Sequence, residues 1–145
     1  MKPFIIICIA FLSLSSCNLG PEEIVYGTDG CHYCNMTIVD RQHASQIVTT
    51  KGKAFKFDAI ECMVHSLKEE VDPATVKLYL INNFENPGEL IDATTATYLV
   101  SKNIPSPMGA YLSGFEDVDT AEETMDKHQG ELYNWKEIQS YLNVE

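Results

Sequence analysis

Residues 44–82 read ASQIVTTKGKAFKFDAIECMVHSLKEEVDPATVKLYLIN, and this stretch decides the fold. Residues 44–50 are rich in β-branched side chains, and residues 54–57 alternate between small or polar and aromatic side chains, which predicts two strands. Residues 51–53, Lys-Gly-Lys, form the turn between them. Residues 76–82 are the third predicted strand.

Between the second and third strands the apolar pattern takes the period of a helix. The residues that carry this period are Ile60, Val64 and Leu67. Asp58 is placed to cap the helix, with Glu61 three residues later as in a capping box. We expect the helix to end before Pro73. The resulting order is strand, strand, helix, strand.

The second half of the chain repeats this order without visible sequence identity to the first. We expect a connector over residues 83–96, strands over 97–101, 110–113 and 131–134, and helices over 116–128 and 135–142. The pattern predicts an α+β fold in which two small ββαβ units share one core, with a flexible N-terminal tether. One domain would then cover residues 30–145, with halves at about 30–85 and 90–145.

Residues 1–16 have the layout of a signal peptide. Lys2 precedes the apolar run 4–12, which is much shorter than the roughly 20 residues that cross a bilayer. The next motif, Leu-Ser-Ser-Cys ending at Cys17, resembles the bacterial lipobox, in which the cysteine thiol carries the lipid. We therefore expect lipidation at Cys17, a lipid-anchored tether over residues 17–29, and a domain that is held to a membrane and faces the periplasm or another extracytoplasmic space.

The composition and motifs disfavour several classes of function. Hydrophobic residues make up 45% of the chain, enough to bury a core, and the formal net charge is −11. Lysines and arginines form no cluster, so we expect no nucleic-acid partner. We find no Ser/His/Asp set, phosphate-binding loop or pair of catalytic carboxylates, and do not expect an enzyme.

Side chains that bind soft metals gather at three places. The segment Cys31-His32-Tyr33-Cys34-Asn35-Met36 holds two thiols, an imidazole and a thioether. Cys62 and His65 share one face of the predicted helix because they are three residues apart. Met108 lies between Pro107 and Gly109, in a turn rather than on an element that faces the core. His43 and His128 are expected at the surface.

Three interpretations of these residues compete. Cys31, Cys34, Cys62 and His65 have the spacing of a structural zinc site. Cys31 and Cys34 alone could form a redox-active dithiol pair, although the βαβ pattern of thioredoxin-like proteins is missing. The third interpretation is Cu(I), which thiolate and thioether ligands select, and Met36 and Met108 favour it over zinc.

The same residues carry a resemblance that extends over nearly the whole chain after the lipobox. The motifs are Cys31–Met36, Phe57-Asp58, Cys62-Met63, Leu90–Ala93, Ala96–Val100, Pro107–Gly109, Phe115, Ala121, Gly130 and Trp135–Glu137. They resemble the NosL family, accessory lipoproteins of nitrous oxide reductase. The family motif usually has glycine where this chain has Asn35, and asparagine also tolerates a left-handed turn.

The resemblance implies a membrane-anchored Cu(I) chaperone. Such a protein would deliver copper to the apoprotein of nitrous oxide reductase and work with an ABC-type maturation complex. The residues that match the family would make Cys31, Cys34, Met36 and Met108 the copper ligands, with Cys62 and His65 as further candidates. A zinc-stabilised interaction domain and a thiol oxidoreductase remain the alternatives.

Overall fold

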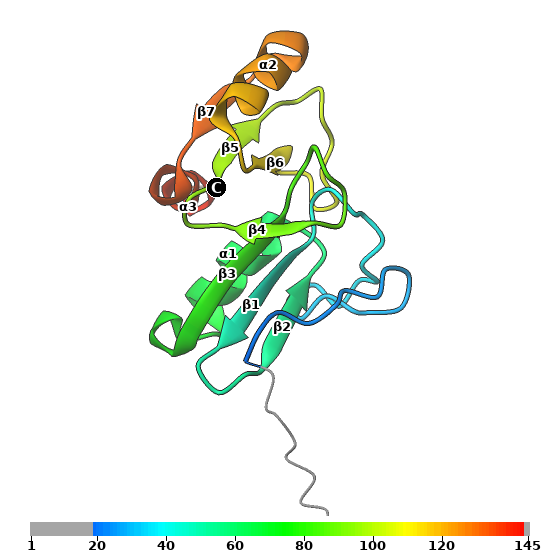
Figure 1. Cartoon of the computed structure of the whole chain (residues 1–145), viewed down its shortest axis with the longest axis vertical. Coiled ribbons are helices and arrows are strands. Elements are labelled where there is room, and N and C mark those ends of the chain that lie inside the picture. The colour runs from blue at the N-terminus through cyan, green and yellow to red at the C-terminus, as the bar shows by residue number, and fades with distance from the viewer. Residues whose placement is uncertain (1–18, 144–145) are drawn as a thin grey trace, which may run out of the picture.

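The computed structural model describes residues 19–143 and has an α+β fold of two small antiparallel sheets and three α-helices (Figure 1). The expected signal peptide and Cys17 lie outside the described residues. Within residues 19–143, no helix has the length and apolar character needed to cross a bilayer.

The first sheet has the strand order β2-β1-β3-β4. It consists of β1 (Ser45–Thr49), β2 (Ala54–Phe57), β3 (Val76–Asn82) and β4 (Leu90–Asp92). All five residues of β1 are buried. The strand lies between β2 and β3, helix α1 contacts it, and the segment around Glu22 contacts Gln46. β1 to β3 confirm the predicted strands. β4 lies within residues 83–96, where only a connector and no strand was expected.

The second sheet has the order β6-β5-β7, which repeats the topology of the first three strands. Its strands are β5 (Thr97–Val100), β6 (Leu112–Phe115) and β7 (Glu131–Tyr133). The helices of this half are α2 (Val118–His128) and α3 (Trp135–Leu142). In each half the first strand is central and the helix follows the second strand, so the predicted ββαβ order is confirmed in both.

The helix of the first half, α1 (Ile60–Glu69), begins differently from the prediction. Its N-cap residue is Ala59, which makes no side-chain cap hydrogen bond, so the capping box of Asp58 and Glu61 is wrong. Both carboxylates are instead turned into the protein, at 2% and 3% exposure respectively. A short 3-10 helix, η1 (Pro73–Thr75), then leads into β3.

One hydrophobic core joins the two halves. It includes Phe57, Ile60 and Met63 from the first half and Tyr98 and Ile138 from the second, all fully buried. Helix α1 contacts β1 and β2 of its own half and also β6 and α3 of the other. The elements that carry site residues are therefore fixed relative to each other by shared packing.

Two expectations about the periphery need correction. Residues 22–29 of the expected tether pack against the first sheet: Ile24 joins the core, and the Glu22 backbone exchanges hydrogen bonds with the Gln46 side chain. His43 is buried at 2% exposure, rather than at the surface, because its ring bonds to Asp40 and Ser113.

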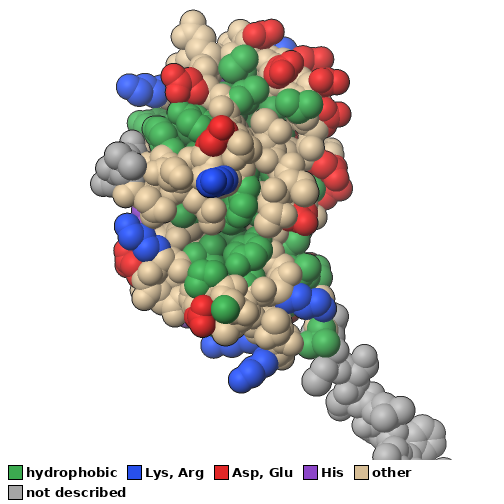
Figure 2. All heavy atoms as spheres, turned by 90° about the vertical axis from the view of Figure 1, so that its left-hand side faces the viewer, with side chains coloured by type: hydrophobic (Ala, Val, Ile, Leu, Met, Phe, Trp, Pro, Cys, Tyr) green, Lys and Arg blue, Asp and Glu red, His purple; other side chains and the backbone are tan. Residues whose placement is uncertain are grey.

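Charge is unevenly distributed over the surface. On the face in Figure 2, acidic side chains gather along one edge of the upper part of the molecule, the half that contains α2, whereas lysines and arginines lie apart from one another. Helix α2 itself carries Asp119, Glu122, Glu123 and Asp126. His128, at the end of this helix, is exposed as predicted.

Candidate metal centre

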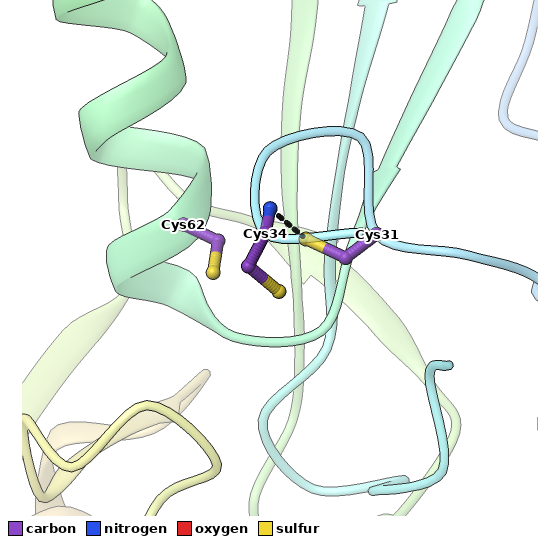
Figure 3. A group of neighbouring side chains, drawn as sticks. All are labelled: Cys31, Cys34 and Cys62. Carbon is purple, nitrogen blue, oxygen red and sulfur yellow. Dashed lines mark hydrogen bonds between the residues drawn. The ribbon is translucent and has the colours of Figure 1, made fainter. Parts of the chain in front are cut away.

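Three cysteine thiols from two segments of the chain meet at one point (Figure 3). Cys31 and Cys34 come from the loop before β1, and Cys62 comes from the first turn of α1. Their Sγ atoms all lie within 4.8 Å of one another, and all three thiols are free. With metal–sulfur bonds of about 2.3 Å, sulfurs of one site stand roughly 3.8–4.0 Å apart. Small side-chain movements would therefore suffice to bind a metal ion.

Backbone hydrogen bonds hold the loop that carries Cys31 and Cys34. The Cys31 N–H donates to the Met36 carbonyl at 2.8 Å, and the Asn35 N–H donates to the Cys31 carbonyl at 3.0 Å. The chain reverses at Asn35, whose φ of 63° lies in the left-handed region. Asparagine is one of the few residues besides glycine that visit this region readily, because its short polar side chain can hydrogen-bond locally. The loop is therefore shaped before any metal binds.

The three thiols differ in their access to solvent. Cys31 is 2% exposed and Cys62 is 1% exposed, whereas Cys34 is only partly buried. Cys34 is therefore the thiol that a group from outside the protein can reach first.

The three thiols also differ in their pKa values. A hydrogen bond from the Cys62 thiol lowers the pKa of Cys31 to about 5, against the opposing effect of burial. The backbone N–H of Cys34 also donates to Cys31 Sγ, at 3.4 Å. The same hydrogen bond from Cys62, together with burial, raises the pKa of the Cys62 thiol, and burial raises that of Cys34. Cys31 is therefore the thiol that loses its proton most readily, and metal binding would displace the protons that remain on the cluster.

Asp58 lies beside this cluster without facing solvent. Its backbone N–H donates to Cys31, while its Oδ1 is buried with no hydrogen-bond partner within the described part of the chain. Burial, and then the negative charge on Cys31, raise the pKa of the Asp58 carboxyl. A cation bound by the thiols would reduce this repulsion.

The other predicted ligands belong to the cysteine loop or line a cavity with Cys62. Met36 belongs to the same loop, but this residue is 54% exposed. Met108 is 42% exposed and lines a cavity of about 310 Å³ together with Cys62 and His65. The His65 ring stacks on the Tyr33 ring with centroids 5.8 Å apart. Within residues 19–143, His65 does not join the three sulfurs as a close donor.

Glu61 is a residue of this region to which the sequence assigned a different role. Its Oε1 accepts hydrogen bonds from Ser106 Oγ at 2.9 Å and from the Ala110 N–H at 3.2 Å, so it contacts the turn that carries Met108. A glutamate in the first turn of a helix is ordinarily explained by capping or by the helix dipole. The sequence contains only a weak indication that Glu61 contacts the Met108 turn, namely its place next to Cys62.

The donor set defines what the site can bind. Three thiolates suit soft or borderline cations, and both Cu(I) and Zn(II) accept them. Thioethers such as those of Met36 and Met108 extend the set towards Cu(I), because methionine is a ligand for copper rather than for zinc.

Comparisons with known proteins agree with this fold. The NosL family model matches residues 24–142. The copper-binding lipoprotein NosL of Stutzerimonas stutzeri is 31% identical in an alignment of 124 residues that covers 81% of this chain. The chain spans 65% of the length of that relative.

A solved structure has the same architecture. It is the crystal structure of the copper chaperone NosL from Shewanella denitrificans, with a TM-score of 0.68 and 22% sequence identity over 82% of this chain and 95% of that one. The structural likeness establishes the fold, and the family match covers both halves and all three cysteines of the cluster. This chain therefore belongs to the NosL family.

Proposed function

We propose that this protein is a Cu(I) chaperone, a non-enzymatic carrier that binds one soft metal ion and passes it to a partner. The observation that carries the proposal is the cluster of three free thiols within 4.8 Å. Cu(I) is the cation that thiolate and thioether ligands select. The similarity to a copper-binding lipoprotein of the same family supports copper as the cargo.

The exposure of the thiols suits transfer rather than storage. Cys31 and Cys62 are buried, and Cys34 remains accessible. A ligand from a partner could therefore replace Cys34 first and the buried thiols afterwards. Because each exchange replaces one soft ligand with another, the copper ion need never be released into water.

The recipient and the location complete the proposal. We propose that the copper is delivered for assembly of the copper centres of nitrous oxide reductase, together with an ABC-type maturation complex. Cys17 would carry the lipid and hold the domain at a membrane of the cell envelope, on its extracytoplasmic side. These assignments are supported by the lipobox and by the family, of which one relative is named a lipoprotein.

The competing function is a zinc-stabilised interaction domain. His65 favours it, because this residue lines the same cavity as Cys62 and would be the fourth ligand of a tetrahedral zinc site. A structural zinc site contributes directly to folding, so its removal unfolds small zinc domains. A carrier must instead stay folded after it releases its cargo. Cys31 and Cys62 belong to the shared core, but most of that core consists of apolar side chains that do not bind metals, so we expect the fold to persist without the ion.

The test compares both metals on the reduced chain that begins at residue 17, with Cys17→Ser to avoid lipidation. Competition against chromogenic chelators measures Cu(I) and Zn(II) affinity, and circular dichroism follows folding after chelation. We expect preference for Cu(I) and an unchanged spectrum of the apoprotein. Preference for Zn(II), or loss of structure when zinc is removed, would favour the interaction domain. Binding of neither metal would leave the dithiol interpretation.

A further inference from the structure

We infer that Glu61 is a positioning residue for the copper site: its buried carboxylate holds the turn that carries Met108 against α1, next to Cys62. The inference rests on the proposed Cu(I) site, and it assigns a task to a residue that contributes no ligand atom. It also explains how a side chain from the second half is brought to a cluster that belongs to the first.

The contacts of Glu61 enclose Met108 in the sequence. Oε1 accepts from Ser106 Oγ at 2.9 Å and from the Ala110 N–H at 3.2 Å, and these two residues lie two positions before and two positions after Met108. The turn is closed on itself by the Gly109 N–H, which donates to the Ser106 carbonyl at 3.1 Å. A single carboxylate oxygen therefore fixes both ends of a short, closed turn.

The position of Glu61 determines where this turn lies. Glu61 and Cys62 both lie in the first turn of α1, so the turn that Glu61 binds lies at the same end of this helix as the Cys62 thiol. Met108, Glu61 and Cys62 line one cavity of about 310 Å³. Met108 is 42% exposed, so core packing does not account for its placement.

The burial of Glu61 is not explained by a gain in folding stability. The residue is 3% exposed, and its Oε2 has no hydrogen-bond partner within the described residues. Burying a carboxylate with incomplete hydrogen bonding is costly, and the helix dipole offsets only part of that cost. A role in holding the Met108 turn accounts for the cost, because the hydrogen bonds that Glu61 does make go to that turn.

The experiment is a double-mutant cycle on the full mature chain with Cys17→Ser. Glu61→Ala removes the acceptor, Glu61→Gln keeps an acceptor oxygen, and Met108→Leu removes the sulfur. We expect Glu61→Ala to weaken Cu(I) binding by roughly three- to tenfold, and Glu61→Gln to recover most of the loss. In the Met108→Leu background, Glu61→Ala should have almost no further effect. Glu122→Ala, on the exposed face of α2, is the control and should leave affinity unchanged.

A second readout follows the ligand directly. With the methionine methyl groups labelled with carbon-13, Cu(I) should shift the Met108 signal strongly in the wild type and weakly in Glu61→Ala. Ser106→Ala removes one donor but leaves the carboxylate in place. If Glu61→Ala does not fold, Ser106→Ala should show a smaller loss of affinity with the same dependence on Met108.

The outcomes separate this inference from the proposed function. A wild-type protein without Cu(I) affinity would overturn the function itself. Wild-type binding with equal affinity in folded Glu61→Ala would overturn the positioning role alone. The positioning role would also be overturned if Glu61→Ala lowers Cu(I) affinity equally in the wild-type and Met108→Leu backgrounds. The carboxylate would then act through the stability of the fold and not through Met108. If Glu61→Ala does not fold, Ser106→Ala decides the question. The positioning role would be overturned if Ser106→Ala binds Cu(I) as tightly as the wild type, or if its loss of affinity is the same in the Met108→Leu background.

Discussion

His43 and Ser113 are joined by a hydrogen bond of 3.1 Å between the ring Nε2 and Oγ, which ties the loop before β1 to strand β6. The other ring nitrogen, Nδ1, lies 2.9 Å from Asp40 Oδ2, and since an ionised carboxylate only accepts, Nδ1 carries the proton. The chain of Asp40, His43 and Ser113 thus links the first half, which carries the thiols, to the second half, which carries Met108.

Asp40→Asn should lower stability in a pH-dependent way. Burial alone would raise the pKa of Asp40, but hydrogen bonds from the His43 ring and the Gln42 N–H outweigh it, so the pKa lies below its ordinary value. A lowered pKa stabilises the fold above the unfolded-state value, and the contribution is lost as the pH falls through the folded-state value. We expect a loss of about 1–3 kcal/mol at pH 7 that narrows below about pH 4.

Urea unfolding of both proteins at pH 7 and pH 3 measures this difference. Asp126→Asn, on the exposed part of α2, is the control and should cost little at either pH. A stability difference between wild type and Asp40→Asn that is the same at both pH values would contradict the assigned ionisation.

The strands were predictable where local pattern and burial agree. β1 contains β-branched side chains, β3 is a longer and mostly apolar strand, and β2 follows a turn at Gly52, whose φ is 84°. β4 was missed because its three residues closely follow the turn-forming residues Asn86, Pro87 and Gly88 of the connector, and its structure comes from pairing with β3. The start of α1 was mispredicted because Asp58 satisfies the capping pattern locally, whereas packing beside Cys31 turns it inward.

The same distinction applies to the site: contacts between residues close in the sequence were predictable, and contacts between distant residues were not. Cys31 and Cys34 are close in the sequence, so their proximity followed directly from the motif. The approach of Cys62 required only the fold of the first half. Glu61 and Ser106 are 45 positions apart in the sequence, and no local sequence pattern predicts their contact. His43 was placed at the surface because its partner Ser113 is 70 positions away.

Asn35 should accept glycine but not a β-branched residue. Its φ of 63° is strained for most side chains and costs roughly 1–2 kcal/mol where the side chain cannot compensate. Asn35→Gly should therefore change the free energy of unfolding by less than about 1 kcal/mol, while Asn35→Val should lose more and weaken metal binding by distorting the loop. Chemical unfolding and Cu(I) competition measure the two effects. Equal behaviour of the two variants would show that the left-handed turn is not required.

Cys17→Ala should release the protein from membranes. The expected lipid is attached to the thiol of the lipobox cysteine, and a protein held by acyl chains loses its anchor when that thiol is absent. Labelling with a fatty acid, followed by separation of membranes, tests the expectation in cells. The substitution should leave Cu(I) affinity unchanged, because the proposed copper site is built from Cys31, Cys34 and Cys62. Label that persists on the Cys17→Ala form would disprove the assigned site.

Met108→Leu should separate the thioether from the thiolates. Leucine keeps the volume and hydrophobicity of methionine, and the residue is 42% exposed, so the free energy of unfolding should barely change. Only the sulfur is lost, and we expect Cu(I) affinity to fall on the order of tenfold, which corresponds to about 1.4 kcal/mol. Zn(II) affinity should stay constant, because a thioether is a poor ligand for zinc.

Met125→Leu is the matched control, since Met125 lies in α2 and packs against the smaller hydrophobic cluster of the second half. Its substitution should change neither metal affinity. A competition titration with a Cu(I) chelator measures all three proteins under the same reducing conditions. If Met108→Leu and wild type bind Cu(I) equally while both are folded, Met108 is not a ligand. In that case the three cysteines would form the site without it, and the cavity beside Cys62 would need another explanation.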